Sequence, residues 1–159
     1  MSSEKRKIAY IDGKPYEIGA NHTSILKFVK SYVGEKKVPT LCDDPNLAPY
    51  GACRVCSVEV ALEKDGPTRM VASCHTPVAE NQHIFTSNEA ITSLRKNIVE
   101  LVLTDHPMEC DSCEVNNNCE LQTVANDLGI SDHRYNSPKQ HKGIPRDTSH
   151  DYMRMNLDN

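Results

Sequence analysis

The chain has few aromatic residues and no long apolar run. Its 159 residues include no tryptophan and only two phenylalanines, and no segment reaches the roughly 18 apolar residues that span a bilayer. Residues 2–7 (SSEKRK) lead directly into an alternating segment, without the apolar stretch or cleavage site of a signal peptide. These absences predict a modest apolar core, no transmembrane segment and a cytoplasmic location, where thiols stay reduced.

Neither charge nor glycine pattern indicates a nucleotide or nucleic-acid ligand. The formal net charge is only -4, and the basic residues are scattered rather than aligned in one stripe, which argues against nucleic acid as a partner. A glycine-rich phosphate loop is also missing from the sequence.

What the sequence does contain is seven cysteines, which form two groups of four ligands once one histidine is added. The first group, with gaps of ten, two and seventeen residues, is Cys42, Cys53, Cys56 and Cys74. The second, with gaps of three, two and five, is His106, Cys110, Cys113 and Cys119. An odd cysteine count is awkward for disulfides but natural for two ligand sets. Because every cysteine is then a ligand, no cysteine nucleophile remains and we expect no catalytic site in this chain.

The types of ligand alone do not decide whether the two groups bind iron-sulfur clusters or zinc. Four thiolates suit either, although the long gaps of the first group are looser than those of paired zinc knuckles. Gly51 and Ala52 leave room for backbone N–H groups to approach sulfur, which favours a cluster. The second group fits a zinc site of three cysteines and one histidine equally well. A zinc-stabilised interaction domain is therefore the alternative to an electron carrier.

Hydrophobic periodicity predicts a mixed sheet with one helix in the first half of the chain. Residues 7–18 alternate around Asp12-Gly13, as in a hairpin. Apolar spacing then predicts a helix over 23–33, ended by Gly34 in a left-handed conformation. After an irregular cysteine loop, strands are expected where alternation returns, at 56–62, 68–73 and 82–86. This order predicts a β-grasp arrangement.

The second half reads as two helices followed by a polar tail. A helix capped by Ser87 or Asn88 is expected to end near Thr104, and a short second helix is expected to stop at Gly129. From Ser131 onward few large apolar residues remain, so we expect this tail to be flexible or docked on a partner. The predicted domains are 1–86, 87–130 and the tail 131–159.

Three segments carry a family resemblance, namely PTLCDDPNLAPYGACRVCSVEV, VASCHTPV and DHPMECDSCEVNNNCELQ. They resemble the N-terminal iron-sulfur region shared by the large iron-sulfur subunit of bacterial complex I, iron-only hydrogenases with their diaphorase subunits, and NAD-linked formate dehydrogenases. The resemblance covers about residues 6–130. It implies an α+β chain: a β-grasp, ubiquitin-like [2Fe-2S] ferredoxin-type domain, then a small helical [4Fe-4S] domain with one histidine and three cysteine ligands.

The same resemblance assigns the ligands. It places a [2Fe-2S] cluster on Cys42, Cys53, Cys56 and Cys74. It places a [4Fe-4S] cluster on His106, Cys110, Cys113 and Cys119.

The resemblance also implies a role in a larger redox assembly. In the family, further [4Fe-4S] domains and often a catalytic domain follow, whereas this sequence has no cysteine beyond Cys119. The ending MRMNLDN resembles the approach to another cysteine motif, which favours a fragment over a short subunit. Glu120, Leu121 and Gln122 resemble the hydrogenase and formate dehydrogenase branch more than complex I. We therefore expect single-electron transfer between a flavin/NADH module and a catalytic metal subunit.

Overall fold

The computed structural model describes residues 6–132, 134–135 and 143–155, in two compact units. The first unit is Met1–Ile98 and the second is Val99–Asn159. Their boundary falls within helix α2 (Glu89–Leu103), so this helix contributes residues to both.

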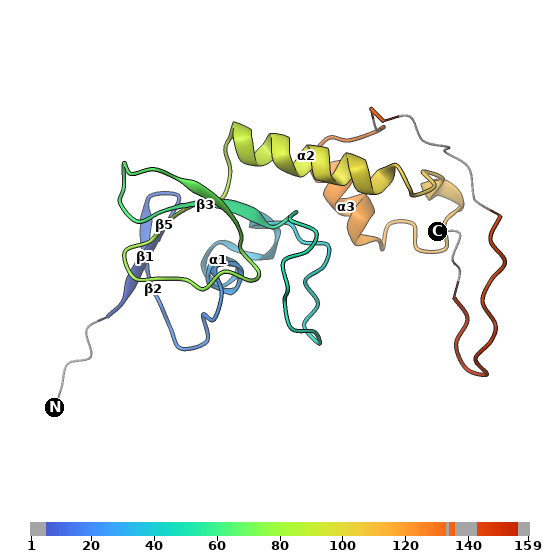
Figure 1. Ribbon diagram of the computed structural model, residues 1–159, viewed down its shortest axis with the longest axis horizontal. Coiled ribbons are helices and arrows are strands. Elements are labelled where there is room, and N and C mark those ends of the chain that lie inside the picture. Colours follow the sequence, from blue (N-terminus) through green and yellow to red (C-terminus); the bar gives the residue numbers. More distant parts are fainter. Residues whose placement is uncertain (1–5, 133, 136–142, 156–159) are drawn as a thin grey trace. The chain divides into compact units, whose positions relative to one another are not determined.

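The first unit is built on a mixed five-stranded sheet in the order β2-β1-β5-β3-β4. Its strands are β1 (Ile8–Ile11), β2 (Lys14–Glu17), β3 (Ser57–Ala61), β4 (Arg69–Ala72) and β5 (His83–Phe85). Only the β1–β5 pairing is parallel, and the other three pairings are antiparallel. The predicted mixed sheet is therefore confirmed, with each predicted strand present within a residue or two (Figure 1).

The first hairpin turns at Asp12-Gly13, as predicted. Both residues have positive φ, 47° and 83°, which is the requirement of a type I′ turn. The Asp12 carboxylate also accepts hydrogen bonds from Thr86 N–H (2.8 Å) and Thr86 Oγ1–H (2.6 Å). The turn is thereby tied to the chain just after β5.

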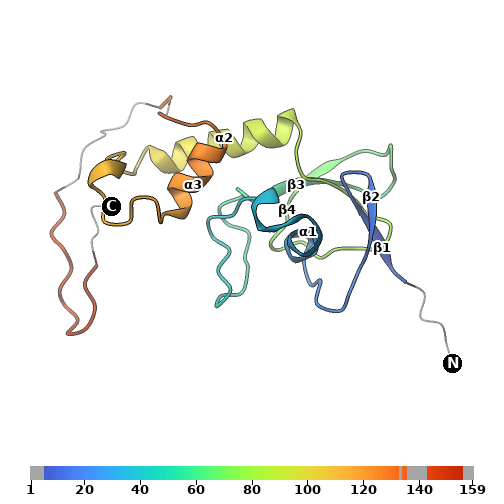
Figure 2. The same cartoon turned by 180° about the vertical axis from the view of Figure 1, so that it is seen from behind.

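Helix α1 (Ile25–Val33) packs the core of the first unit. It starts later than predicted because Ser24 is its N-cap, accepting from Lys27 N–H. The buried helix residues are Ile25, Leu26, Phe28 and Val29. Gly34 has the predicted positive φ of 97°, but its ψ of 160° is extended rather than left-handed helical, so that part of the prediction is wrong. Figure 2 shows this helix from the opposite side of the sheet.

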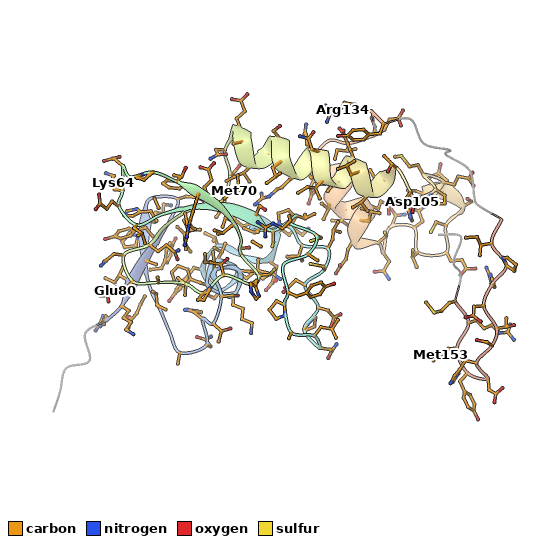
Figure 3. The ribbon with its side chains drawn as sticks, viewed as in Figure 1. Lys64, Met70, Glu80, Asp105, Arg134 and Met153 are labelled. Carbon is orange, nitrogen blue, oxygen red and sulfur yellow. The ribbon has the colours of Figure 1, made fainter. Side chains whose placement is uncertain are left out.

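Charged side chains are exposed in two of the connections between the strands. Lys64, in the turn between β3 and β4, and Glu80, ahead of β5, are exposed and extend outward in Figure 3. Met70 on β4 is half-buried.

Helices α2 and α3 (Glu120–Asp127) also follow the predicted pattern. Asn88 caps α2 by accepting from Ile91 N–H at 2.8 Å. After α3, Gly129 has a φ of 67°, and Ile130 N–H returns to the Ala125 carbonyl at 2.9 Å. Such a glycine-terminated helix end satisfies carbonyls that the helix leaves unpaired.

The predicted tail has little apolar packing in its described part. Asp147 and Met155 form an antiparallel bridge with hydrogen bonds of 2.9 and 3.0 Å. Tyr152, Met153 and Met155 are all exposed, and Figure 3 labels Met153 on this segment. The predictions for residues 133, 136–142 and 156–159 lie outside the described residues. Across the part of the chain that the structure describes, no helix has the length and apolar content to cross a membrane.

Candidate cluster-binding sites

The first cysteine group lies where the long loop before β3 meets the end of the β3–β4 hairpin. Cys42 and Cys53 are half-buried on the loop. Cys56 directly precedes β3 and Cys74 follows β4, and these two residues are only 1% and 2% exposed. The register that pairs Ser57 with Ala72 brings them together across 18 residues of sequence. None of the seven cysteines forms a disulfide.

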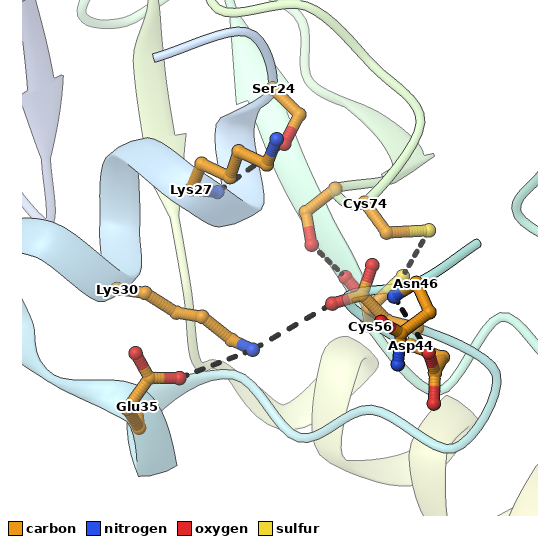
Figure 4. A network of polar contacts seen from close by, with 10 residues as sticks. Ser24, Lys27, Lys30, Glu35, Asp44, Asn46, Cys56 and Cys74 are labelled. Carbon is orange, nitrogen blue, oxygen red and sulfur yellow. Dashed lines mark hydrogen bonds and ion pairs between the residues drawn. The ribbon is translucent and has the colours of Figure 1, made fainter. Parts of the chain in front are cut away.

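The four thiols of this group are arranged as two pairs. The sulfurs of Cys56 and Cys74 lie 3.4 Å apart (Figure 4). Cys42 and Cys53 form the other pair, and Cys53 N–H donates to Cys42 Sγ at 3.5 Å. Two thiolates on one tetrahedral metal, each about 2.3 Å from it, lie roughly 3.8 Å apart. The two pairs therefore fit two metal atoms with two thiolates each.

A single ion fits this arrangement less well than a cluster does. Within the described ranges, no three His, Cys, Asp or Glu side chains converge closely enough to hold one metal ion. A mononuclear zinc site needs four ligands around one centre. In a cluster the ligands are distributed over several iron atoms. A cluster therefore requires the two thiol pairs to lie farther apart than the four ligands of a single zinc ion do.

The protonation of these thiols depends on burial and on nearby N–H groups. Burial, then the neighbouring Cys56 thiol, raises the pKa of Cys74 to about 12. Burial acts to raise the pKa of Cys53 too, but hydrogen bonds led by Val55 N–H outweigh it and lower that pKa below its ordinary value. Burial also raises the pKa of Cys42. Because the raised pKa keeps the Cys74 thiol protonated near neutral pH, metal binding at this residue would release a proton.

Gly51 lets the cysteine loop pass close to the end of β4. Its φ is +69°, and a Cβ there would lie 3.3 Å from Ala72 Cβ and 3.4 Å from His75 Cβ. The ring of His75 also lies against the loop, with Nδ1 3.1 Å from the Pro49 carbonyl oxygen. Gly51 therefore does more than give N–H groups access to sulfur, because it also allows this close packing.

We predict that Gly51→Ala destabilises the protein by about 2–4 kcal/mol, from left-handed backbone strain and overpacking together. Gly13→Ala is the matched control, because Gly13 has a φ of +83° but open space around a Cβ. It should lose only the backbone part, about 1–2 kcal/mol. Chemical denaturation of both variants measures the difference, and equal losses would show that the packing at Gly51 is unimportant.

The turn between Cys53 and Cys56 is fixed by hydrogen bonds that the sequence did not reveal. Ser57 donates to the Arg54 carbonyl through both its N–H (3.0 Å) and its hydroxyl (2.6 Å). Ser73 Oγ–H donates to the Cys56 carbonyl at 2.7 Å. Arg95, on α2, donates through Nη2 to the Ser57 carbonyl at 2.7 Å. Arg95 lies four residues after Ile91, on the apolar stripe of α2. A charged residue in that stripe is the sequence signal that could have revealed this contact.

The second group surrounds a cavity of about 500 Å³ in the second unit. All four predicted ligands line it: His106, Cys110, Cys113 and Cys119. His106 follows the end of α2, and Cys119 directly precedes α3. The cavity wall also includes Leu103 of α2 and Leu121 of α3, so both helices contribute to it.

The loop before Cys119 is hydrogen-bonded to one glutamine of α3. Gln122 accepts from Asn117 N–H and donates to Asn116 Oδ1, both at 2.8 Å. Asn117 has a φ of 62°, a conformation that asparagine tolerates better than most residues. Arg146 of the tail also lines the cavity and lies 3.5 Å from Glu114. The cavity is therefore bounded by apolar helix residues and a polar loop.

Comparisons with known proteins assign both regions. Residues 8–89 match the family described as a 2Fe-2S iron-sulfur cluster binding domain. Residues 95–134 match the NADH-ubiquinone oxidoreductase-G iron-sulfur binding region, a [4Fe-4S] family. The first match covers more than half of the chain and the first cysteine group, and the second covers the histidine-containing group. The chain is thus an iron-sulfur protein, and it belongs to the 2Fe-2S cluster-binding domain family.

The curated relatives that match this chain are subunits of redox enzymes. The NADPH-Fe(3+) oxidoreductase subunit alpha of Geobacter sulfurreducens is 34% identical over 137 residues, which is 86% of this chain and 15% of the relative. One subunit of the NADH-quinone oxidoreductase of Escherichia coli K12 is 35% identical over 133 residues, covering 82% of this chain and 14% of the relative. The chain spans about 15% of the length of these relatives.

A solved structure shares the fold. It is the NAD+-reducing [NiFe]-hydrogenase in its H2-reduced state, with a TM-score of 0.74 at 23% identity, over 91% of this chain and 57% of that chain. With two cluster-binding families matched in order, the cofactors are one [2Fe-2S] and one [4Fe-4S] cluster. Nothing in these comparisons supports the zinc alternative. The chain is an iron-sulfur electron-transfer module of the kind found in NADH-type oxidoreductases.

Proposed function

We propose that the two residue groups are the ligands of the two clusters. The [2Fe-2S] ligands would be Cys42, Cys53, Cys56 and Cys74, and the [4Fe-4S] ligands would be His106, Cys110, Cys113 and Cys119. The observation that supports this proposal most strongly is the arrangement of the two groups. The first group forms two close thiol pairs, the second lines one cavity, and each group lies inside the region that matches the corresponding cluster-binding family. We assign the first group to a β-grasp domain, 1–86, and the second to a small helical domain, 87–130.

The side chains of the first group would bind, orient and shield their cluster. When bound, the two clusters supply one-electron transfer. Cys56 and Cys74 keep water from one end of the site because both are almost fully buried. The N–H groups of Cys53 and Val55 already point at ligand sulfurs and would donate to them in the holoprotein. Such donors favour the more negative state and so tune the reduction potential.

The histidine distinguishes the second group from an all-cysteine site. A neutral imidazole in place of a thiolate removes one negative charge from the ligand shell, which raises the reduction potential. The apolar side chains of Leu103, Leu121 and Ile130 line the same cavity and would limit water access.

For the biological role, we propose single-electron transfer between a flavin/NADH module and a catalytic metal subunit. The relatives are subunits of an NADPH-Fe(3+) oxidoreductase and of an NADH-quinone oxidoreductase, and both of these enzymes are named for a nicotinamide nucleotide. We favour a hydrogenase or formate dehydrogenase assembly over complex I because of the residues at 120–122. Further [4Fe-4S] domains would be additional partners, and the free cysteines favour a reducing cytoplasm.

Stepwise reduction followed by electron paramagnetic resonance tests this proposal. The anaerobically purified chain should be brown and should give two distinct paramagnetic signals, one from each cluster. A colourless protein without either signal would contradict the electron-transfer role and favour a structural metal.

A further inference from the structure

Arg95 is a buried cation beside the first cysteine group. The residue is only 5% exposed on the face of α2 that also buries Ile91. Its Nη2 donates to the carbonyl of Ser57, the residue next to Cys56, at 2.7 Å. Its Nε is buried, and none of the described residues forms a hydrogen bond with it. The guanidinium is therefore held against the turn that carries two of the four cysteines.

Burial of this charge is expensive in the absence of a counterion. Among the residues that the structure describes, no carboxylate forms an ion pair with Arg95. Burial lowers the pKa of Arg95 to about 10, whereas the negative charge of the Cys56 thiolate acts to raise this pKa. A buried charge with one carbonyl partner destabilises a fold relative to an apolar side chain of similar size. Packing alone therefore does not account for an arginine at this position.

Other cations near the loop differ from Arg95 in a way that matters electrostatically. Arg54 lies between two of the cysteines but is exposed, so water and salt screen its charge. Lys30 forms ion pairs with two carboxylates, that of Glu35 at 3.2 Å (Figure 4) and that of Asp43 at 3.7 Å. A guanidinium that is buried and lacks a carboxylate partner acts on nearby negative charge through a low dielectric.

We propose that Arg95 is the charge-compensating and positioning residue of the first site, stabilising the more negative, reduced state of the group that Cys56 holds. Its charge raises the reduction potential of that group, and its bond to Ser57 fixes the Cys53–Cys56 turn. The inference rests on the proposed function, since it requires Cys56 to be a [2Fe-2S] ligand.

Two substitutions separate charge from hydrogen bonding. Arg95→Gln keeps an amide donor and removes the charge, whereas Arg95→Lys keeps the charge. Arg69→Gln is the matched control, because Arg69 on β4 is exposed. The measurement is the midpoint of the [2Fe-2S] signal in a redox titration of the full chain, with thermal unfolding recorded in parallel.

We expect Arg95→Gln to lower the equilibrium constant for reduction about tenfold, which is about 59 mV for a one-electron couple. Arg95→Lys and Arg69→Gln should retain the midpoint of the unsubstituted protein. The midpoint should depend on whether residue 95 is charged, even if the thermal stabilities of the two variants differ in another way.

Three outcomes would overturn the inference. The first is an unchanged midpoint in Arg95→Gln. The second is an equal fall of the midpoint in Arg95→Gln and Arg95→Lys, because that result would assign the effect to hydrogen bonding rather than to charge. The third outcome applies if Arg95→Gln does not retain the cluster, in which case the midpoint of Arg95→Lys is the test. A tenfold lower equilibrium constant for reduction in Arg95→Lys would then overturn the inference. Absence of a [2Fe-2S] signal from the unsubstituted protein would instead contradict the proposed function.

Discussion

Cys56→Ala is expected to abolish the [2Fe-2S] cluster while leaving the [4Fe-4S] cluster in place. Cys56 is 1% exposed and its sulfur lies 3.4 Å from that of Cys74, so its loss leaves one proposed iron atom with a single thiolate. Iron and labile sulfide should each fall by about two per chain. The [2Fe-2S] paramagnetic signal should vanish, and the other signal should remain.

The same variant should lose much of the stability of the first unit. Cluster binding contributes folding energy in small metal-binding domains, and the apolar core here contains few aromatic residues. Ser73→Ala is the control, since Ser73 is fully buried and donates to the Cys56 carbonyl but supplies no ligand. It should cost about 1 kcal/mol and keep both clusters. Retention of full iron and sulfide by Cys56→Ala would exclude Cys56 as a ligand.

His106→Cys is expected to keep the [4Fe-4S] cluster and lower its midpoint potential. Thiolate in place of neutral imidazole adds one negative charge to the ligand shell, which disfavours adding an electron. By comparison with clusters that carry histidine ligands, the fall should be on the order of 100 mV or more. Redox titration of the [4Fe-4S] signal measures it.

The control for an added thiol is His150→Cys, because His150 is exposed on the tail and is not among the residues that line the cavity. It should leave both midpoints unchanged. A midpoint of the [4Fe-4S] signal that is the same in His106→Cys and the unsubstituted protein would argue against histidine ligation.

Much of the fold could be predicted because its signals are local. Asp12-Gly13 can adopt the two positive φ values of a tight hairpin turn, and Ser24 and Asn88 are residues that cap helices. The end of α1 was harder to predict. Gly34 supplies the positive φ, but its ψ of 160° leads the chain into a short helical turn at Glu35–Lys37, and no local sequence pattern predicted this turn.

The composition of the candidate sites could be read from the sequence, but their arrangement could not. Spacing grouped the cysteines, whereas the pairing of Cys56 with Cys74 follows from the register of the β3–β4 hairpin. Gly51 packs against residues more than twenty positions away. Arg95 contacts Ser57 across 38 positions. Such contacts depend on tertiary packing, which periodicity and propensity do not encode.

The most direct test of the central claim is the content of iron, acid-labile sulfide and zinc in the anaerobically purified chain. Two clusters on eight ligands predict about six iron and six sulfide per chain, with little zinc. Zinc near two equivalents per chain, without labile sulfide, would contradict the account.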